Sequence, residues 1–291
     1  MQLEQGRIVK GVGGLYTVAA GSTRYTCMAR GLFRKQKITP LVGDIVDIQI
    51  LDEAKLEGCL HAITPRRNEL IRPKAANIDL ALVVFAAADP VIQPDLLDSF
   101  LLSCARQHVN AAVCINKTDL ESAEIVESIV SDYVKAEYPV LRVSATEQAE
   151  LTSLQSLAQG KTVIFAGPSG VGKSSLINAL VPDAQMETGE LSRKLVRGKH
   201  TTRHTELLQV NHDTFIVDSP GFSSLSITDI AAEELPSLYP EFQQYHGQCY
   251  YGDCMHISEP DCAIRAHIGD TIGKARYDRY LTFLEKIKDA R

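Results

Sequence analysis

The pattern of apolar and polar positions changes character along the chain, and its first part is typical of a small β-barrel. Up to about residue 64, short stretches rich in β-branched and aromatic residues are separated by glycine and proline. We expect five strands there, with no clear helix: residues 7–10, 15–19, 24–28, 44–50 and 58–63. Five short strands predict a barrel such as an OB-fold, although an SH3-like barrel gives the same pattern. Residues 66–73 then resemble a polar linker.

The middle of the chain alternates strands with helices. Residues 78–85 are apolar apart from Asp79, as expected for a strand that is buried on both faces of a parallel sheet. The other predicted elements are strands at 111–115, 140–143, 162–166 and 214–217, and helices at 96–106, 123–136 and 173–180. This alternation predicts an α/β domain of three layers.

The end of the chain differs again, with a Cys/His cluster followed by an amphipathic helix at 274–288. We therefore expect three domains: a barrel over residues 1–67, an α/β domain over 68–228 and a metal-binding domain with helices over 229–291. A length of 291 residues suits such a division, and 45% hydrophobic with 23% charged residues is ordinary globular composition.

Several classes of protein are disfavoured by composition. The longest apolar run, residues 80–88, is far shorter than the roughly 18 residues of a membrane span. The first residues lack the basic and apolar parts of a signal peptide. Three of the seven cysteines lie between 249 and 262 beside a histidine, which favours a reducing compartment with one metal site over a disulfide framework. We expect a cytoplasmic protein with no membrane partner.

The strongest motif is a phosphate loop that follows the strand at 162–166 and opens the next helix. It reads Gly167-Pro168-Ser169-Gly170-Val171-Gly172-Lys173-Ser174. Its glycines allow backbone N–H groups to surround phosphate oxygens at a helix N-terminus. Lys173 would neutralise the β- and γ-phosphates, and Ser174 would ligate Mg²⁺. The alternative is a glycine-rich turn without a ligand.

A second motif, Asn116-Lys117-Thr118-Asp119, indicates which base is bound. It lies at the carboxyl end of the strand at 111–115, where ligands of open α/β sheets bind. The Asp119 carboxylate can accept the N1 and N2 hydrogens of guanine, whereas adenine offers neither. Alone, the motif could be a helix-capping turn, but Ser144-Ala145 at the end of the next strand favours a guanine site.

A third element, Asp218-Ser219-Pro220-Gly221, follows the strand at 214–217. Asp218 would face Mg²⁺, and the Gly221 N–H would meet the γ-phosphate. Before it, the polar loop at 198–204 holds Thr201 and Thr202, either of which could be a further Mg²⁺ ligand. A solvated basic loop would explain its Lys and Arg residues but not the paired threonines.

The order of these motifs is that of a circular permutation. Ordinary GTPases run from the phosphate loop to the guanine motif, whereas here the guanine motif comes first. Phe222 stands where Ras-like enzymes place a water-orienting glutamine, so slow intrinsic hydrolysis is expected. We expect His200 to orient or deprotonate the water, with His204 as the second candidate.

The C-terminal cluster consists of Cys249, Cys254, His256 and Cys262. Three thiolates and an imidazole in 14 residues match a closed structural Zn²⁺ site with no open position for catalysis. Free cysteines, or His246 or His267 as the fourth ligand, are the alternatives.

The permuted motifs between a barrel and a Cys/His module resemble the RsgA family (also called YjeQ or YloQ), bacterial GTPases of small ribosomal subunit biogenesis. The resemblance covers nearly the whole chain and includes Pro40-Leu41-Val42-Gly43-Asp44. It implies an OB-fold, a permuted GTPase domain and a zinc-binding domain. It also implies a role in late assembly of the 30S subunit and its 16S rRNA, with GTP hydrolysis to GDP stimulated by that subunit. Residues 116–119 would bind guanine and Gly167 to Ser175 the phosphates.

Two other classes compete with this interpretation. A phosphate-loop kinase or ATPase is opposed by the motif at Asn116 to Asp119. An RNA-binding zinc protein with a decayed nucleotide site is opposed by the intact Lys173, Ser174 and Asp218. No heptad repeat is present, so we expect a monomer.

The net charge of −6 does not exclude RNA, because it is unevenly distributed. Residues 1–74 contain 12 Lys+Arg against 7 Asp+Glu, whereas residues 75–238 contain 11 against 21. The stretch 191–205 has five Lys/Arg and no carboxylate. The barrel and this loop are therefore the expected RNA-facing surfaces.

Overall fold

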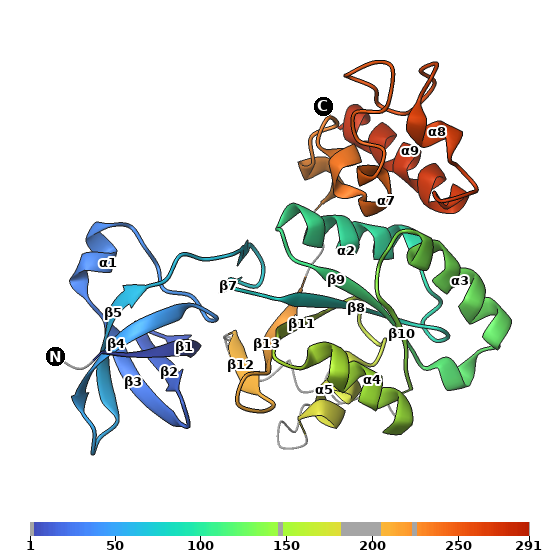
Figure 1. The fold of residues 1–291 in the computed structure, drawn as a ribbon. Coiled ribbons are helices and arrows are strands. Elements are labelled where there is room, and N and C mark those ends of the chain that lie inside the picture. Colours follow the sequence, from blue (N-terminus) through green and yellow to red (C-terminus); the bar gives the residue numbers. More distant parts are fainter. Residues whose placement is uncertain (1–2, 145–147, 182–204, 223–225, 291) are drawn as a thin grey trace.

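The computed structural model describes residues 3–144, 148–181, 205–222 and 226–290. A β-barrel, a central α/β unit and a helical C-terminal module follow one another along the chain (Figure 1). The C-terminal module lies beside helix α2 (Pro94–Arg106), on the opposite side of that helix from the central sheet (Figure 1). None of the helices in the described ranges has the length and apolarity needed to cross a membrane.

The N-terminal unit is a five-stranded OB-like barrel, as predicted. Its strands are β1 (Leu3–Val12), β2 (Leu15–Ala20), β3 (Thr23–Ala29), β4 (Ile45–Asp52) and β5 (Glu57–Ile63). Strand β1 pairs with both β2 and β4, and β3 pairs with β5 in parallel, so that the sheet closes on itself. The expectation of no helix is wrong, because α1 (Gly31–Lys35) buries Phe33 against the barrel core.

The central unit has the predicted three layers. The sheet order is β10 (Val140–Arg142), β9 (Ala111–Asn116), β8 (Leu80–Ala86), β11 (Thr162–Ala166), β13 (Phe215–Phe222) and β12 (Glu206–Gln209). All neighbouring pairs are parallel except β12–β13. Residues of α2 and α3 (Ala123–Lys135) pack with one set of strand residues, and those of α4 (Gln148–Ala158) and α5 (Lys173–Leu180) with the other set. The two helix pairs cover opposite faces (Figure 1).

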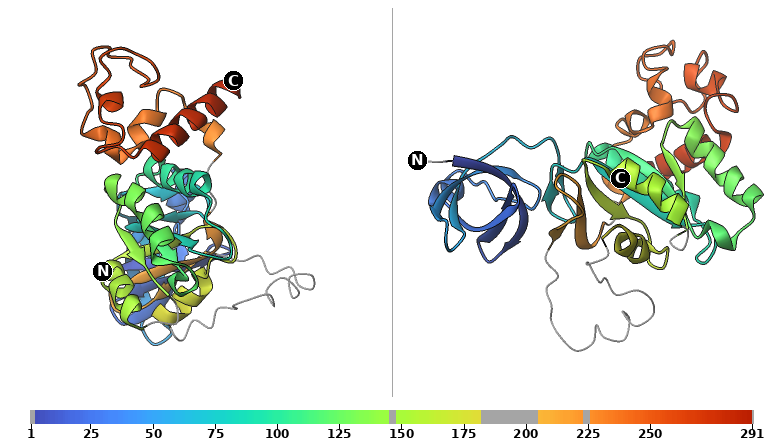
Figure 2. Two further views of the ribbon diagram at one scale, coloured as in Figure 1. Left: turned by 90° about the vertical axis from the view of Figure 1, so that its right-hand side faces the viewer. Right: turned by 60° about the horizontal axis from the view of Figure 1, so that its bottom comes forward.

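The barrel and the α/β unit share one continuous sheet of eleven strands. Lys10 on β1 is the register partner of Glu206 on β12, and their side chains form an ion pair at 2.6 Å. Arg7, also on β1, lies over the Phe215 ring at 5.0 Å and donates to the Thr162 hydroxyl. Strand β1 therefore reaches the first residues of both β11 and β13, the strands that lead to the phosphate loop and to Asp218. The right-hand view of Figure 2 shows the barrel beside the α/β unit.

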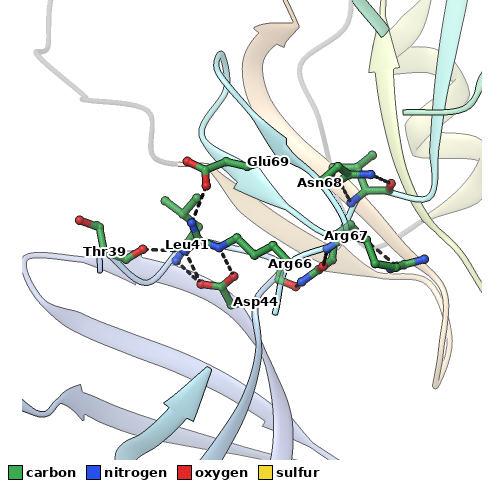
Figure 3. Close-up of polar contacts among 10 residues, drawn as sticks. Thr39, Leu41, Asp44, Arg66, Arg67, Asn68 and Glu69 are labelled. Carbon is green, nitrogen blue, oxygen red and sulfur yellow. Dashed lines mark hydrogen bonds and ion pairs between the residues drawn. The ribbon is translucent and has the colours of Figure 1, made fainter. Parts of the chain in front are cut away.

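Residues 66–73 are not a simple polar linker, which corrects the prediction. The Asp44 carboxylate is fully buried and receives Arg66 Nε at 2.7 Å and Nη2 at 2.9 Å, and the Leu41 N–H donates to the same carboxylate (Figure 3). A bidentate pair whose carboxylate also accepts a backbone donor fixes both partners in geometry. The short strands β6 (Glu69–Leu70) and β7 (Ala75–Ala76) pair directly after it, and Leu70 is fully buried.

Gly43, next to Asp44, provides a test of this junction. Its φ is +96°, and a Cβ there would lie 2.0 Å from the Ala76 carbonyl oxygen, which is backbone and cannot move aside cheaply. We expect Gly43→Ala to lower the free energy of unfolding by about 2–4 kcal/mol through strain and a displaced β7. Chemical denaturation measures this, with Gly13→Ala as the control, since Gly13 also has positive φ but open space around it. Equal losses in both variants would contradict the account.

The C-terminal module contains η3 (Ile227–Asp229), η4 (Leu235–Leu238), α7 (Pro240–Gln243), α8 (Ala263–Ala266) and α9 (Lys274–Asp289). A buried ion cluster joins it to α2. Arg276 is 1% exposed and bonds Glu241 at 2.5 Å and Asp98 at 2.6 Å. Although burial lowers the pKa of Arg276, the two carboxylates hold that pKa well above its usual value. Arg279 also bonds Asp98, so two guanidinium groups face two buried carboxylates and the cluster is balanced in charge.

Candidate nucleotide site and metal centre

The phosphate-loop residues connect strand β11 to helix α5, as the sequence predicts. Gly167, Gly170 and Gly172 all have positive φ, at +126°, +87° and +92°. A Cβ on Gly167 would lie 2.1 Å from the Val84 carbonyl oxygen. A Cβ on Gly172 would likewise collide with the side chain of Asn116. Gly167 and Gly172 are therefore required both by their positive φ and by the lack of space for a side chain.

Lys173 begins helix α5, and its ammonium group lies within the loop. Its Nζ donates to the carbonyl oxygens of Gly167 at 2.8 Å and Pro168 at 2.6 Å. Burial lowers the pKa of Lys173 from its ordinary value. An anionic phosphate at this position would favour the charged form and replace hydration that the ammonium has lost. Ser174 and Ser175 follow in the first turn of the same helix.

Asn116 joins two motifs that are far apart in the sequence, since its bonded partner Val171 lies 55 residues further along the chain. It is the last residue of β9, and its Nδ2 donates to the Val171 carbonyl oxygen at 2.8 Å. A Cβ on Gly172 would lie 2.2 Å from the same Nδ2. Asn116 Oδ1 is buried and has no partner among the described residues. The guanine motif is thus in direct contact with the phosphate loop.

The rest of the guanine motif follows Asn116 in a tight turn. Lys117 has a left-handed backbone with φ of +59°, and its ammonium bonds the Asp89 carbonyl oxygen. Thr118 and Asp119 lie in a short 3₁₀ helix, η1 (Thr118–Leu120), and the Asp119 carboxylate is exposed to solvent. A solvent-exposed carboxylate can accept the paired donors of a base.

Three supporting residues are not predicted by the sequence. The segment after β8 provides Asp89, whose carbonyl oxygen accepts Lys117, and Pro90, whose Cδ lies 3.8 Å from where a Cβ on Gly170 would be. Glu150, on α4, accepts the backbone N–H of Ser144, which is 2% exposed. None of these residues belongs to a recognisable motif, because none of these contacts depends on a fixed spacing in the sequence. Ala145 lies outside the described residues.

Asp218 lies inside a strand instead of ending one, which corrects the prediction. Strand β13 continues from Phe215 through Gly221 to Phe222, and Val217 is the register partner of Ile164 on β11. Adjacent strands therefore bring Asp218 and the phosphate loop to the same edge of the sheet. His200, Thr201, Thr202 and His204 lie outside the described residues.

The predicted metal ligands converge in the C-terminal module. The side-chain ligand atoms of Cys249, Cys254, His256 and Cys262 all lie within 4.8 Å of one another. His256 Nδ1 is 3.7, 3.3 and 3.4 Å from the three Sγ atoms in that order, and Cys249 Sγ is 4.0 Å from Cys262 Sγ. Bonds of about 2.3 Å to sulfur and about 2.0 Å to nitrogen give a tetrahedron with edges of about 3.5–3.8 Å. The cluster therefore fits one tetrahedral ion.

The other two histidines considered as ligands do not join this cluster. His267 Nδ1 lies 2.8 Å from the Ala263 carbonyl oxygen, and its ring stacks on Tyr245. His246 is not among the clustered ligands. The cluster's own loop is supported by Tyr277 and Tyr280, whose hydroxyls donate to the carbonyl oxygens of His256 and Met255, both at 2.6 Å.

The carboxylate of Glu259 also holds the loop that carries the Cys/His cluster in place. Glu259 accepts the backbone N–H groups of Met255, Ile257 and Ser258 at 2.7–3.0 Å. Although desolvation raises the pKa of Glu259, these backbone donors bring it below its ordinary value.

The phosphate loop, the guanine motif on β9 and the strand order define a circularly permuted phosphate-loop GTPase, flanked by an OB-like barrel and a Cys₃His module. Known proteins agree with this class. The RsgA GTPase family model matches residues 63–228, and the RsgA N-terminal domain model matches residues 5–58. The chain belongs to the RsgA GTPase family, and it is a GTP-hydrolysing enzyme.

Similar proteins cover the chain from end to end. A protein of Agathobacter rectalis named small ribosomal subunit biogenesis GTPase RsgA is 45% identical over 98% of both chains. One of the same name from Alkaliphilus metalliredigens is 41% identical over 99% of both. Among solved structures, YloQ, described as a circularly permuted GTPase, matches with a TM-score of 0.84 at 37% identity, over 100% of this chain and 96% of that one. YjeQ from Thermotoga maritima matches with a TM-score of 0.85 at 29% identity over the full length of both.

Proposed function

We propose that the chain hydrolyses GTP to GDP and phosphate in order to assist late maturation of the small ribosomal subunit. The observation that carries the nucleotide part is the hydrogen bond from Asn116 to Val171, which joins the guanine motif to the phosphate loop. The ribosomal part is supported by the names of the full-length relatives. In this proposal, domain 1–67 binds RNA, domain 68–228 binds and hydrolyses GTP, and domain 229–291 binds zinc. A role in ribosome assembly places the protein in the cytoplasm.

Within this proposal, the base is held by residues Asn116 to Asp119 with Ser144 and Ala145, and the phosphates by Gly167 to Ser175. Asp119 accepts the two guanine donors, and Lys173 neutralises the phosphates. Mg²⁺ would be held by Ser174, Thr201 and Asp218, and Gly221 would meet the γ-phosphate. When bound, the ion supplies charge neutralisation between the β- and γ-phosphate oxygens.

Asp119 tests the base assignment. We expect Asp119→Asn to weaken GDP binding by about 10²-fold or more and to improve binding of xanthosine diphosphate, because an amide donates where xanthine has a carbonyl. Competition titrations with GDP, ADP and xanthosine diphosphate measure this, and Asp95→Asn on α2 is the control. Tight ADP binding by the wild type would instead favour a kinase or ATPase.

His200 is proposed as the residue that orients the attacking water, because Phe222 cannot do so. We expect His200→Ala to lower subunit-stimulated turnover by about 10²-fold while GTP affinity stays within about twofold. His204→Ala is the matched comparison, because it removes the neighbouring imidazole. Unchanged stimulated turnover in His200→Ala would reject this role.

Zinc is the metal we propose for the Cys₃His cluster, because thiolate and imidazole donors in a tetrahedral arrangement select Zn²⁺. Four protein ligands make it structural. The 30S subunit and its 16S rRNA are the proposed partners, contacted by a monomer. The excess of Lys and Arg in residues 1–74 supports the barrel as an RNA-facing surface. Co-sedimentation with 30S particles at increasing salt tests this contact.

A further inference from the structure

A groove of about 450 Å³ opens beside the Cys₃His cluster. Its walls come from the η4–α7 region and from the loop that carries the cluster, and it is lined largely by apolar side chains such as Phe242, Met255 and Ile264. Its exposed polar or aromatic members are Glu233, Ser237, Gln243, His246, Tyr251 and Asp253. This groove has no part in the nucleotide site.

The two carboxylate side chains that line the groove, Glu233 and Asp253, are not matched by a basic lining residue. Neither lysine nor arginine lines the groove. The chain contains no lysine or arginine between Arg203 and Arg265, although ten aspartates and glutamates fall in that interval. Three thiolates and a neutral imidazole on the proposed divalent zinc would add a further net negative charge at the wall formed by Cys249, Cys254 and His256.

The same loop presents the most exposed aromatic rings of the described chain. Tyr250 is 76% exposed and Tyr251 is 44% exposed, and no other tyrosine or phenylalanine whose side chain the structure describes is exposed. The two rings contact each other edge to face, with centroids 5.0 Å apart. Exposed aromatic faces attract either nucleobases or the cationic side chains of Arg and Lys.

Charge decides between these two ligands. A nucleic acid would bring phosphates to a groove whose lining side chains include carboxylates and no lysine or arginine, and that arrangement is repulsive. An Arg/Lys-rich peptide instead finds opposite charge at Glu233 and Asp253, aromatic faces at Tyr250 and Tyr251, and an apolar floor for its methylene stems. We propose that this groove binds an Arg/Lys-rich peptide segment of a protein partner. The C-terminal module would then contact protein while the basic barrel contacts RNA.

A binding experiment on the full-length, zinc-loaded protein tests this proposal. The probe is a short fluorescent peptide of alternating Arg, Lys and Ser residues, followed by anisotropy at physiological salt. We expect the double variant Glu233→Gln/Asp253→Asn to weaken binding at least about fivefold, and Tyr251→Ala to weaken it by a similar factor. The matched control is Glu285→Gln/Asp289→Asn, which removes two exposed carboxylates of α9 and should change binding less than about twofold.

Three results would overturn the proposal. Peptide binding that falls equally in both double variants would show only attraction to the net acidic chain, and absence of binding by the wild type would remove the site. A single-stranded RNA that binds more tightly to Glu233→Gln/Asp253→Asn and more weakly to Tyr251→Ala would make the loop a base-stacking surface. Zinc content and GTP hydrolysis, measured on every variant, separate these results from misfolding and from failure of the proposed function.

Discussion

Lys173→Ala is expected to lower GTP turnover by about 10³-fold or more, the largest catalytic effect of any single substitution in this chain. The ammonium group supplies the one positive side chain of the phosphate loop, and removal of a preorganised charge-stabilising group costs enzymes about 10²–10⁵-fold in rate. A second loss arises in the free protein, since Lys173 Nζ bonds the carbonyl oxygens of Gly167 and Pro168. Single-turnover hydrolysis with saturating enzyme measures the chemical step apart from binding.

Two further variants distinguish the loss of the Lys173 positive charge from a disturbed conformation of the phosphate loop. Lys173→Met retains most of the side-chain volume without charge and should be as inactive as Lys173→Ala. Lys161→Ala, which removes a lysine that caps the Leu157 carbonyl oxygen before β11, should leave turnover within about twofold. Turnover of Lys173→Ala within about tenfold of wild type would mean that the loop does not bind the transferred phosphate.

Cys262→Ser is expected to remove the bound metal and unfold the loop around it. Cys262 is the most buried cysteine of the cluster, at 5% exposed, and its Sγ lies 3.4 Å from His256 Nδ1 and 4.0 Å from Cys249 Sγ. Structural zinc contributes about 10–16 kcal/mol to small metal-binding peptides, and an alcohol is a poor substitute for a thiolate. Metal content and protease resistance of residues 245–265 should both be lost.

The control for this variant is Cys59→Ser, in strand β5 and outside the cluster, which should retain stoichiometric zinc. His267→Ala should retain it as well, because His267 bonds the Ala263 carbonyl oxygen and is not a cluster ligand. Full zinc occupancy in Cys262→Ser would show that another residue completes the site.

Much of the fold could be predicted because its signals are local. The strand at Thr162–Ala166 and the helix at Lys173–Leu180 have the predicted bounds. A buried strand, a glycine-rich loop and the start of a helix can each be identified from the residue types of a few consecutive positions. Strand β12 was missed because four residues have no periodicity of their own and are ordered by pairing with β13. Helix α4 was missed although Leu151, Leu154 and Ala158 share one buried face.

The residues of the site also fall into those that local sequence motifs predict and those that only the folded structure brings together. Motif spacing located Lys173, Asn116 and the four cluster ligands, because each chemistry requires particular residue types close together in sequence. The supporting contacts could not be predicted, since they join distant positions: Glu150 bonds the Ser144 backbone, and Arg276 meets Asp98 across 178 residues. The prediction of a polar linker at residues 66–73 is wrong for the same reason. Arg66 is a charged residue that suggests a solvent-exposed segment, but it pairs with the fully buried carboxylate of Asp44, 22 residues earlier in the chain.

Multiple-turnover GTP hydrolysis with and without purified small ribosomal subunits tests the central claim most directly. The intrinsic rate should be slow, and added subunits should raise it by at least about tenfold, since Phe222 leaves the water-orienting role to a group that the complex must bring into place. Lys173→Ala should lack both the intrinsic and the subunit-stimulated GTP hydrolysis. Large ribosomal subunits should not stimulate the wild-type enzyme. Equal wild-type rates with and without small subunits would contradict the account.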